Sequence, residues 1–161
     1  MIEKESIKEL SAIQAQDQGP LKRHDTCVIL HLYHPDMWDE IQSYLSNLGN
    51  QFDLFVTTPN EVDISEDGIR AHFPHAQIYR CENRGRDIAP FLGVFSAIAE
   101  LSYKYICKIH TKKSVYLSTG KEWQRDMMDK LLGTPETVAI IKRAFDQHVD
   151  WGIIGPYGHV V

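Results

Sequence analysis

Short runs of apolar residues alternate along this chain with segments in which apolar residues recur every three or four positions. The short runs are rich in β-branched and aromatic residues, as buried strands are, and the longer segments have the spacing of amphipathic helices. Strands are expected at 26–33, 52–57, 77–81, 104–110 and 151–154. Helices are expected at 36–48, 64–73, 88–101, 121–132 and 134–148.

This order of elements predicts an α/β fold of βαβ units, with a mostly parallel open sheet and helices on both faces. Ligands of such sheets bind beyond the carboxyl ends of the strands, near the point where the strand order reverses. Candidate chemistry is therefore sought in the loops after Tyr33, Thr57, Cys81 and His110. The last expected strand lies only a few residues before Val161, as it would in a truncated domain.

The amino-terminal residues have a pattern of their own. Ile7, Leu10 and Ile13 are spaced by three and flanked by charges, which predicts an amphipathic helix or a partner-binding segment. Gly19-Pro20 ends this segment. The length of 161 residues fits one domain, so we expect a leader helix over 1–20 and a single α/β domain over 21–161.

Neither export nor a membrane span is predicted. The amino terminus lacks the cationic and apolar blocks of a signal peptide, and no apolar run approaches the roughly 18 residues of a spanning helix. The three cysteines, Cys27, Cys81 and Cys107, lie in apolar segments, which favours buried thiols in a reducing compartment. We therefore expect a cytoplasmic protein whose contact with a membrane would be peripheral, on its inner face.

Charge is distributed unevenly along the chain. There are 17 Lys and Arg against 22 Asp and Glu, which gives a net charge of −5. Residues 80–125 hold nine basic and four acidic residues, a balance of +5, so the remainder carries −10. The basic stretch indicates either an anionic ligand or a solvated surface. Nucleic acid is not expected as a partner, because the stretch is short and the whole chain is acidic.

The segment 82–87, with the sequence ENRGRD, joins an expected strand to an expected helix. Gly85 allows a sharp turn or a close approach of the backbone to a ligand. Arg84 and Arg86 offer guanidinium groups suited to phosphate or carboxylate, and the N-terminus of the next helix adds partial positive charge. Asp87 has two compatible interpretations, an N-cap or a ligand for a sugar hydroxyl.

A second basic cluster follows the fourth expected strand. Its members are Lys108, His110, Lys112 and Lys113. Alternation along a strand puts Lys108 and His110 on one face. Two such groups on a buried strand are costly unless they face a ligand or a carboxylate. The sequence therefore predicts either an anion site, or a pairing of Lys108 with a structural acid such as Asp87.

Two further sets of residues are candidates. His31, Tyr33 and His34 lie at the end of the first strand, where a nucleotide base can stack, although packing or surface roles are the alternative. Arg125 and Asp126 open a helix soon after the cationic loop, where a surface ion pair is the interpretation we favour. The sequence contains no zinc-ligand spacing, phosphate-binding glycine motif or serine-nucleophile motif.

Taken together, these segments resemble a known family. The stretches ENRGRDIAPFLGVF, YKYICKIHTKKS, GKEWQRDMMDKLLG and GIIGP resemble the rhamnan synthesis protein F family, glycosyltransferase-like proteins of bacterial surface-polysaccharide synthesis. The resemblance runs from Thr26 to Pro156. More distantly, the pattern is similar to the nucleotide-binding half of a GT-A glycosyltransferase, which implies a Rossmann-like, GT-A-type core.

The resemblance implies a function in rhamnan or lipopolysaccharide biosynthesis. The expected reaction moves a sugar, rhamnose first of all, from a nucleotide-diphosphate donor such as dTDP-rhamnose to a glycan or lipid-linked acceptor. The arginines and lysines would hold the diphosphate, and Asn83 and Asp87 would bond to sugar or ribose. If this chain contains the catalytic base, Asp126 is the candidate. The residues assigned to the donor are Asn83, Arg84, Gly85, Arg86, Asp87, Lys108, His110, Lys112 and Lys113.

The sequence departs from the GT-A pattern at the metal motif. Where Asp-x-Asp is expected, residues 108–112 read KIHTK, and Asp-x-Asp occurs nowhere in the chain. Fixed cations are therefore expected to neutralise the leaving diphosphate, and no cofactor is firmly implied, with divalent Mn²⁺ or Mg²⁺ as the alternative. The missing motif and the short carboxyl-terminal part favour an alternative function, a non-catalytic module for sugar-nucleotide binding or for docking in a biosynthetic complex.

Overall fold

The computed structural model describes residues 20–113 and 120–158. The leader helix expected over 1–20 lies, apart from Pro20, outside the described residues. The described chain divides into two compact units, which we treat separately. One comprises 20–35 and 51–111, and the other comprises 36–50, 112–113 and 120–158. The expected single domain over 21–161 stays a prediction.

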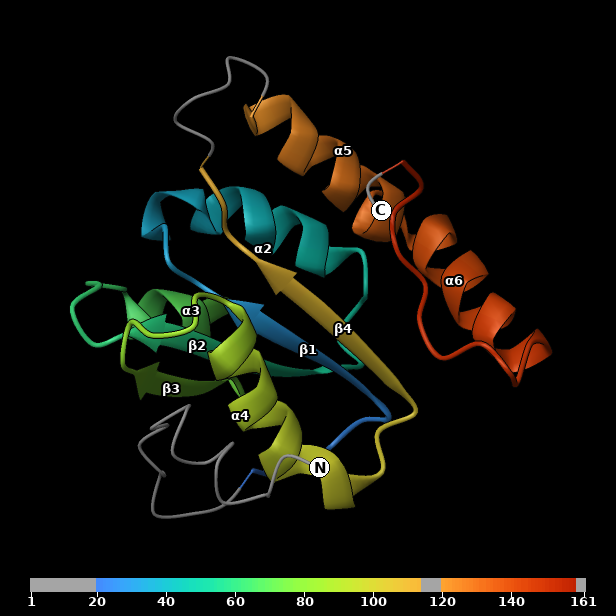
Figure 1. Cartoon of the computed structure of the whole chain (residues 1–161), viewed down its shortest axis with the longest axis horizontal. Helices are drawn as coiled ribbons and strands as arrows, with labels where there is room; N and C mark the ends of the chain where they lie inside the picture. Colours follow the sequence, from blue (N-terminus) through green and yellow to red (C-terminus); the bar gives the residue numbers. More distant parts are fainter. Residues whose placement is uncertain (1–19, 114–119, 159–161) are drawn as a thin grey trace. The chain divides into compact units, whose positions relative to one another are not determined.

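The first unit is built on a four-stranded parallel sheet (Figure 1). Its strands are β1 (Thr26–His31), β2 (Asp53–Pro59), β3 (Gln77–Cys81) and β4 (Tyr105–His110). The order across the sheet is β3-β2-β1-β4, and β1 pairs in parallel with both β2 and β4. This confirms the α/β class, and four of the five expected strands are present.

Helix α4 (Ile88–Ile98), followed by the short helix η2 (Ala99–Leu101), covers one face of the sheet. The core between them forms because alternate residues of neighbouring strands point to the same face. Its buried members are Cys27, Ile29, Phe55, Tyr79, Val94 and Ile98. Burial of these side chains fixes α4 against the sheet. The loop that precedes α4 is thereby held near the carboxyl ends of the strands.

Helix α3 (Glu66–His72) belongs to the opposite face. Ser65 caps it, because its side chain accepts a hydrogen bond from the Gly68 N–H. Arg80 of β3 lies next in sequence to Tyr79, which faces α4, so Arg80 points to the other side and donates to Glu66 of α3 at 3.2 Å. Helices therefore cover both faces of the sheet, as the alternating pattern predicts.

The second unit consists of helices α2 (Trp38–Ser46), which follows the short helix η1 (Pro35–Met37), α5 (Gly120–Leu132) and α6 (Pro135–Gln147). The Tyr44 hydroxyl of α2 donates to Asp129 of α5 at 2.6 Å, and burial together with this carboxylate raises the pKa of Tyr44 to about 12. Thr134 caps α6, with Pro135 in its first turn, as predicted.

The prediction of a fifth strand at 151–154 is wrong, because the structure has no strand there. A strand needs a neighbour to satisfy its backbone groups, and none among the described residues pairs with this segment. The Trp151 N–H instead donates to the His148 carbonyl in a turn, and the two rings stack 4.1 Å apart. The apolar, β-branched pattern predicts strand propensity but not the presence of a partner.

Among the described residues, we find no helix that combines the length and the apolar character needed to cross a bilayer.

The amino end of β2 is held by a buried carboxylate, Asp53, which is 3% exposed. It accepts hydrogen bonds from the backbone N–H groups of Arg23 and His24 and, at 2.6 Å, from the Tyr103 hydroxyl. Burial and this carboxylate raise the pKa of Tyr103. One side chain therefore joins the strand β2 to the chain before β1 and to the chain before β4.

We predict that Asp53→Ala lowers the free energy of unfolding by about 2–4 kcal/mol, because three donors lose a charged acceptor. Urea denaturation measures the change. Asp25→Ala is the matched control, since the Asp25 carboxyl is 76% exposed in its pair with Lys22. It should change stability by no more than about 0.5 kcal/mol. Equal effects of the two substitutions would contradict this role for Asp53.

Candidate functional site

The strand order reverses beside β1, which is the usual place for a ligand in such a sheet. The chain proceeds from β1 to β2 and β3 on one side, and then returns through α4 to β4 on the other. At the carboxyl edge His31 of β1 is the register partner of His110 of β4, and on the other side it is the partner of Thr57 of β2. Three adjacent strands thus carry polar side chains, His31, Thr57 and His110, at the same level of the sheet and on the face that α4 covers.

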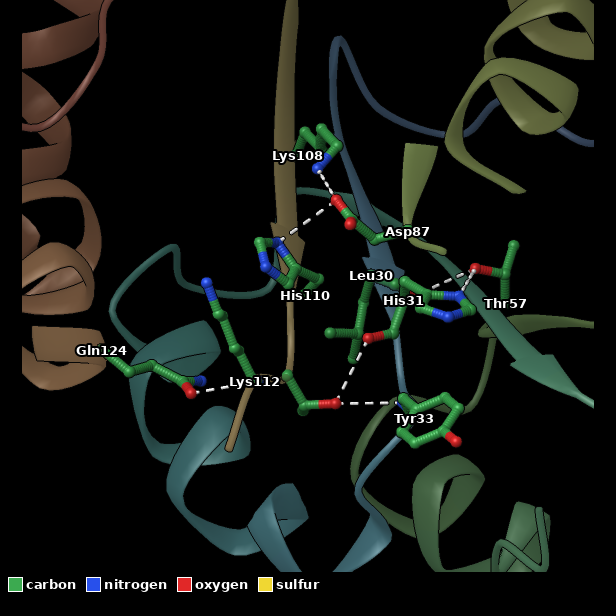
Figure 2. Close-up of polar contacts among 10 residues, drawn as sticks. Leu30, His31, Tyr33, Thr57, Asp87, Lys108, His110, Lys112 and Gln124 are labelled. Carbon is green, nitrogen blue, oxygen red and sulfur yellow. Dashed lines mark hydrogen bonds and ion pairs between the residues drawn. The ribbon is translucent and has the colours of Figure 1, made fainter. Parts of the chain in front are cut away.

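Asp87 lies at the centre of these polar groups. Its carboxylate accepts a hydrogen bond from Lys108 Nζ at 2.5 Å and lies 3.5 Å from His110 Nδ1 (Figure 2). Lys108 and His110 therefore share one face of β4, as alternation predicts. Of the two interpretations given for Lys108, its pairing with Asp87 is present in the structure, and the anion site stays a prediction.

Asp87 occupies the N-cap position of α4, but its side chain makes no capping bond. The carboxylate is engaged by Lys108 instead. Burial alone would raise the pKa of Asp87, but the hydrogen bond from Lys108 and the nearby charges of His110 and Lys108 outweigh burial and lower the pKa below its usual 3.8. The carboxylate is thus held in its charged form, and it offsets the positive charge on β4.

His31 is buried, with 6% of its surface exposed, and its Nδ1 lies 3.0 Å from the Thr57 hydroxyl oxygen. That hydroxyl donates to the Leu30 carbonyl at 3.4 Å, so we assign the shared hydrogen to Nδ1 of His31. Burial is the main reason that the pKa of His31 falls to about 4, aided by the charges of His110 and Lys108 and opposed by Asp87. His31 is therefore neutral at neutral pH.

The loop between β3 and α4 is tightly constrained at Gly85. Its φ is +72°, and a Cβ at this position would lie only 2.5 Å from the Ala89 Cβ. The Gly85 carbonyl accepts hydrogen bonds from the N–H groups of Ile88 and Ala89 at the start of α4. The backbone of Arg86 is also in the left-handed region, with φ +53°, a conformation that is strained for a residue with a side chain. Glycine is thus required at 85 on both steric and conformational grounds.

The side chains of this loop are displayed to solvent. Asn83, Arg84 and Arg86 are all exposed. Among residues 20–113 and 120–158, no carboxylate pairs with either arginine, whereas Arg80 and Lys108 of the same unit each have one. The two arginines are therefore cations of this loop that remain available to an anion arriving from solution.

The chain after β1 is fixed by a residue that sequence reasoning missed. The buried Thr111 hydroxyl accepts hydrogen bonds from the N–H groups of Tyr33 and His34, both at 3.0 Å. The Tyr33 ring is 39% exposed and meets the His34 ring edge to face, with centroids 4.9 Å apart. The available signal was that Thr111 directly follows His110 at the strand end. Tyr33 is thus held with its ring partly open, next to the carboxyl edge.

The remaining candidates belong to the second unit. Lys112 lies over the Trp123 ring, 4.8 Å from its centroid, and the Lys112 N–H donates to the buried Gln124 side chain at 3.1 Å. Lys113 forms an ion pair with Asp36. Asp126 accepts from Lys130 at 2.6 Å, which matches the ion-pair interpretation. Their assignment to the donor and to catalysis stays a prediction.

The donor groups of the described residues bear on metal binding. No three His, Cys, Asp or Glu side chains gather in the described part of the chain in a way that could hold a metal ion. Lys108 and His110 stand at the end of β4, and the neighbouring carboxylate of Asp87 is engaged by the ammonium of Lys108. The expectation that fixed cations take the place of Mn²⁺ or Mg²⁺ stays a prediction.

Comparison with known proteins gives one family and two relatives. The model of the rhamnan synthesis protein F family matches residues 3–158. The uncharacterized protein WxcX of Xanthomonas campestris pv. campestris, from two strains, is 31% identical over 137 residues, which cover 84% of this chain and 19% of WxcX. The chain thus spans about a fifth of the length of these curated relatives. No solved structure matches it.

We predict that Gly85→Ala destabilises the protein by about 2–4 kcal/mol, because the left-handed backbone and the contact with Ala89 both oppose a Cβ. Gly49→Ala is the matched control: Gly49 has φ +70° but no atom within 4 Å of an added Cβ. It should cost only the conformational part, about 1 kcal/mol. Urea denaturation of both variants isolates the steric part, and equal losses would contradict the packing described for Gly85.

We predict that the protein loses stability on acidification between pH 6.5 and pH 4. In this range the unfolded chain takes up a proton at His31, whereas the folded pKa of about 4 keeps that ring neutral. The contribution of His31 to the free energy of unfolding is full above pH 6.5 and should fall by about 2–4 kcal/mol at pH 4.

Urea denaturation from pH 7 to pH 4 measures this slope. His31→Gln should reduce the dependence of the free energy of unfolding on pH, whether or not the substitution changes stability at pH 7. His75→Gln, at an exposed position, should leave it unchanged. An unaltered slope in His31→Gln would rule out His31 as the source.

Proposed function

Because the chain belongs to the rhamnan synthesis protein F family, we propose that it binds the nucleotide-diphosphate sugar donor of a glycosyltransferase of bacterial surface-polysaccharide synthesis. The family itself points to polysaccharide synthesis. The proposed donor is dTDP-rhamnose, and the proposed reaction transfers its sugar. The proposed acceptor is a glycan or a lipid-linked glycan precursor.

The observation that carries the proposal is the pair of exposed arginines on the loop between β3 and α4. Arg84 and Arg86 have no carboxylate partner among the described residues, and they lie at the N-terminus of α4, whose backbone dipole favours an anion. A guanidinium binds phosphate through two parallel N–H groups. If the two arginines only formed a solvated surface, they would not have to lie at the start of a helix, and the residue between them would not have to be glycine.

The other groups of the edge suit the remainder of such a ligand. The Tyr33 ring, held by Thr111, offers a face on which a nucleotide base can stack. Asn83 and Asp87 provide polar oxygens for sugar or ribose hydroxyls. In this proposal Lys108 and His110, which Asp87 holds in place, would turn to the diphosphate as it binds. Asp87 keeps Lys108 oriented until the ligand arrives.

In the proposed transfer, an acceptor hydroxyl attacks the anomeric carbon of the sugar. A bond forms from the acceptor oxygen to that carbon as the bond to the diphosphate oxygen breaks. The hydroxyl proton passes to a base, and the leaving diphosphate takes the electron pair and the negative charge. Fixed guanidinium and ammonium groups stabilise that charge. Asp126 is the candidate base, and it would have to release Lys130 to act.

A second function of a different class, a non-catalytic module that binds a sugar nucleotide, has one observation in its favour. The candidate base Asp126 is already engaged by Lys130, in a chain that spans 19% of its curated relatives. In that case the reacting groups would belong to another part of a longer protein. Release of dTDP from dTDP-rhamnose by this chain, with a suitable acceptor, decides between the two.

We predict that dTDP and dTDP-rhamnose raise the melting temperature, and that Arg86→Gly abolishes the shift without lowering the melting temperature of the free protein. The guanidinium is lost, while glycine relieves the left-handed strain at φ +53°. A ligand at 100 times its Kd contributes about 2.7 kcal/mol, which is a shift of roughly 5–10 °C for a chain of this size. Thermal shift and calorimetric titration in EDTA measure both effects.

Arg84→Ala should weaken dTDP binding by about tenfold to a hundredfold, as expected for the loss of a charged hydrogen bond to phosphate. Arg143→Ala, which removes an exposed arginine of α6, is the matched control and should bind as the unaltered protein does. Full binding by Arg86→Gly would overturn the proposal. Binding that appears only with Mn²⁺ would overturn the role of the fixed cations but not the donor site.

A further inference from the structure

Helix α4 is apolar on every side. None of the eleven residues from Ile88 to Ile98 is charged, and the only hydroxyl is that of Ser96. A surface helix normally carries polar and charged residues on the face turned from the core, and a helix that is apolar all round is normally buried all round. The inner face of α4 is explained by the sheet, through Val94 and Ile98. Its outer face needs a separate explanation.

The outer face carries a stripe of large apolar side chains. Ile88, Leu92 and Phe95 follow one another at spacings of four and three, so they line one side of the helix. They are 52%, 39% and 42% exposed. We call these three residues the outer stripe. Exposed apolar residues are ordinary when scattered, but a continuous stripe on an uncharged helix marks a surface that is covered by something.

We propose that the amino-terminal segment 4–16 of the same chain packs as an amphipathic helix on the outer stripe of α4. This segment lies outside the described residues, and its sequence supplies the counterpart: Ile7, Leu10 and Ile13 form one apolar row, with charged and polar residues on the other sides. The row and the outer stripe each need an apolar partner. Packing one against the other removes both from water.

The place where the described chain begins favours this occupant over a separate molecule. The Leu21 backbone exchanges two hydrogen bonds of 3.0 Å with the Gln77 side chain. Lys22 donates to the Ser102 carbonyl at 3.0 Å and lies over the Tyr103 ring. Ser102 directly follows η2, at the carboxyl end of α4. The segment is therefore tethered beside one end of the surface that it would cover.

The lengths agree as well. A helix of residues 4–16 would be roughly 20 Å long and α4 roughly 16 Å, at about 1.5 Å per residue. Residues 17–19 are a sufficient connection for a parallel arrangement, in which residue 16 lies near the carboxyl end of α4 and residue 4 near its amino end. Because the two helices are parts of one chain, docking has no translational cost, and even a modest apolar contact is stabilising.

Hydrogen exchange of the full chain, read by mass spectrometry, tests the proposal. In the unaltered protein, amides of residues 4–16 should exchange at least about tenfold more slowly than in an unstructured peptide of the same sequence. Leu92→Gln on α4 should abolish that protection, although the substituted residue is far along the chain. Leu10→Gln should abolish it too. Both should lower the melting temperature by about 2–4 °C.

Matched controls separate the stripe from a general polar effect. Ala97→Gln adds the same polar group at another exposed position of α4, outside the outer stripe, and should leave the protection of residues 4–16 unchanged. Lys8→Gln alters the polar side of the segment and should also have no effect. Phe95→Gln is a second outer-stripe variant, in case Leu92→Gln alters the fold of α4 itself.

Three results would overturn the proposal. The first is exchange of residues 4–16 at the unstructured rate in the unaltered protein. The second is protection that survives both Leu92→Gln and Phe95→Gln. The third is protection that disappears on tenfold dilution, which would assign the outer stripe to a second copy of the chain. None of these results bears on nucleotide binding, so the donor-site proposal is tested independently.

Discussion

The parallel pairing of β1 with a strand on each side is the constraint on which the site depends. All six residues of β1 are buried, and its register aligns His31 with Thr57 on one neighbour and with His110 on the other. Parallel strands end at the same edge, so three polar side chains lie together there without any local sequence signal joining them. The chain must then cross the sheet to reach β4, and α4 makes that crossing. The loop that starts α4 is thereby delivered to the same edge.

Asp87 joins the two parts of this edge. A capping aspartate would leave Lys108 unpaired on a half-buried strand, which is costly. The observed pairing of Asp87 with Lys108 instead ties the start of α4 to the end of β4 at 2.5 Å. The arginines beside Asp87 are left exposed on a strained turn. The strained turn and the unpartnered cations of this loop are the features on which the proposed ligand site rests.

The fold also accounts for the contrast between the two faces of α4. Its inner face is fixed by the apolar core, which holds the N-terminus of the helix beside the carboxyl ends of the strands. Its outer face has no charged residue to interact with water. If segment 4–16 covers that face, the donor site and the docked segment share one helix but use different parts of it. A single apolar element would then serve both the core of the sheet and the organisation of the amino terminus.

The sequence by itself determined the element types, the α/β class and the loops in which charged residues gather, because these follow from periodicity and from residue chemistry within a short window. It also determined that Lys108 and His110 share a face. The tertiary structure decided which groups meet. It engaged Asp87 with Lys108 rather than with the helix backbone, brought Thr111 under Tyr33, and left 151–154 without a strand neighbour. These outcomes depend on strand order and on contacts between distant residues, which no local pattern contains.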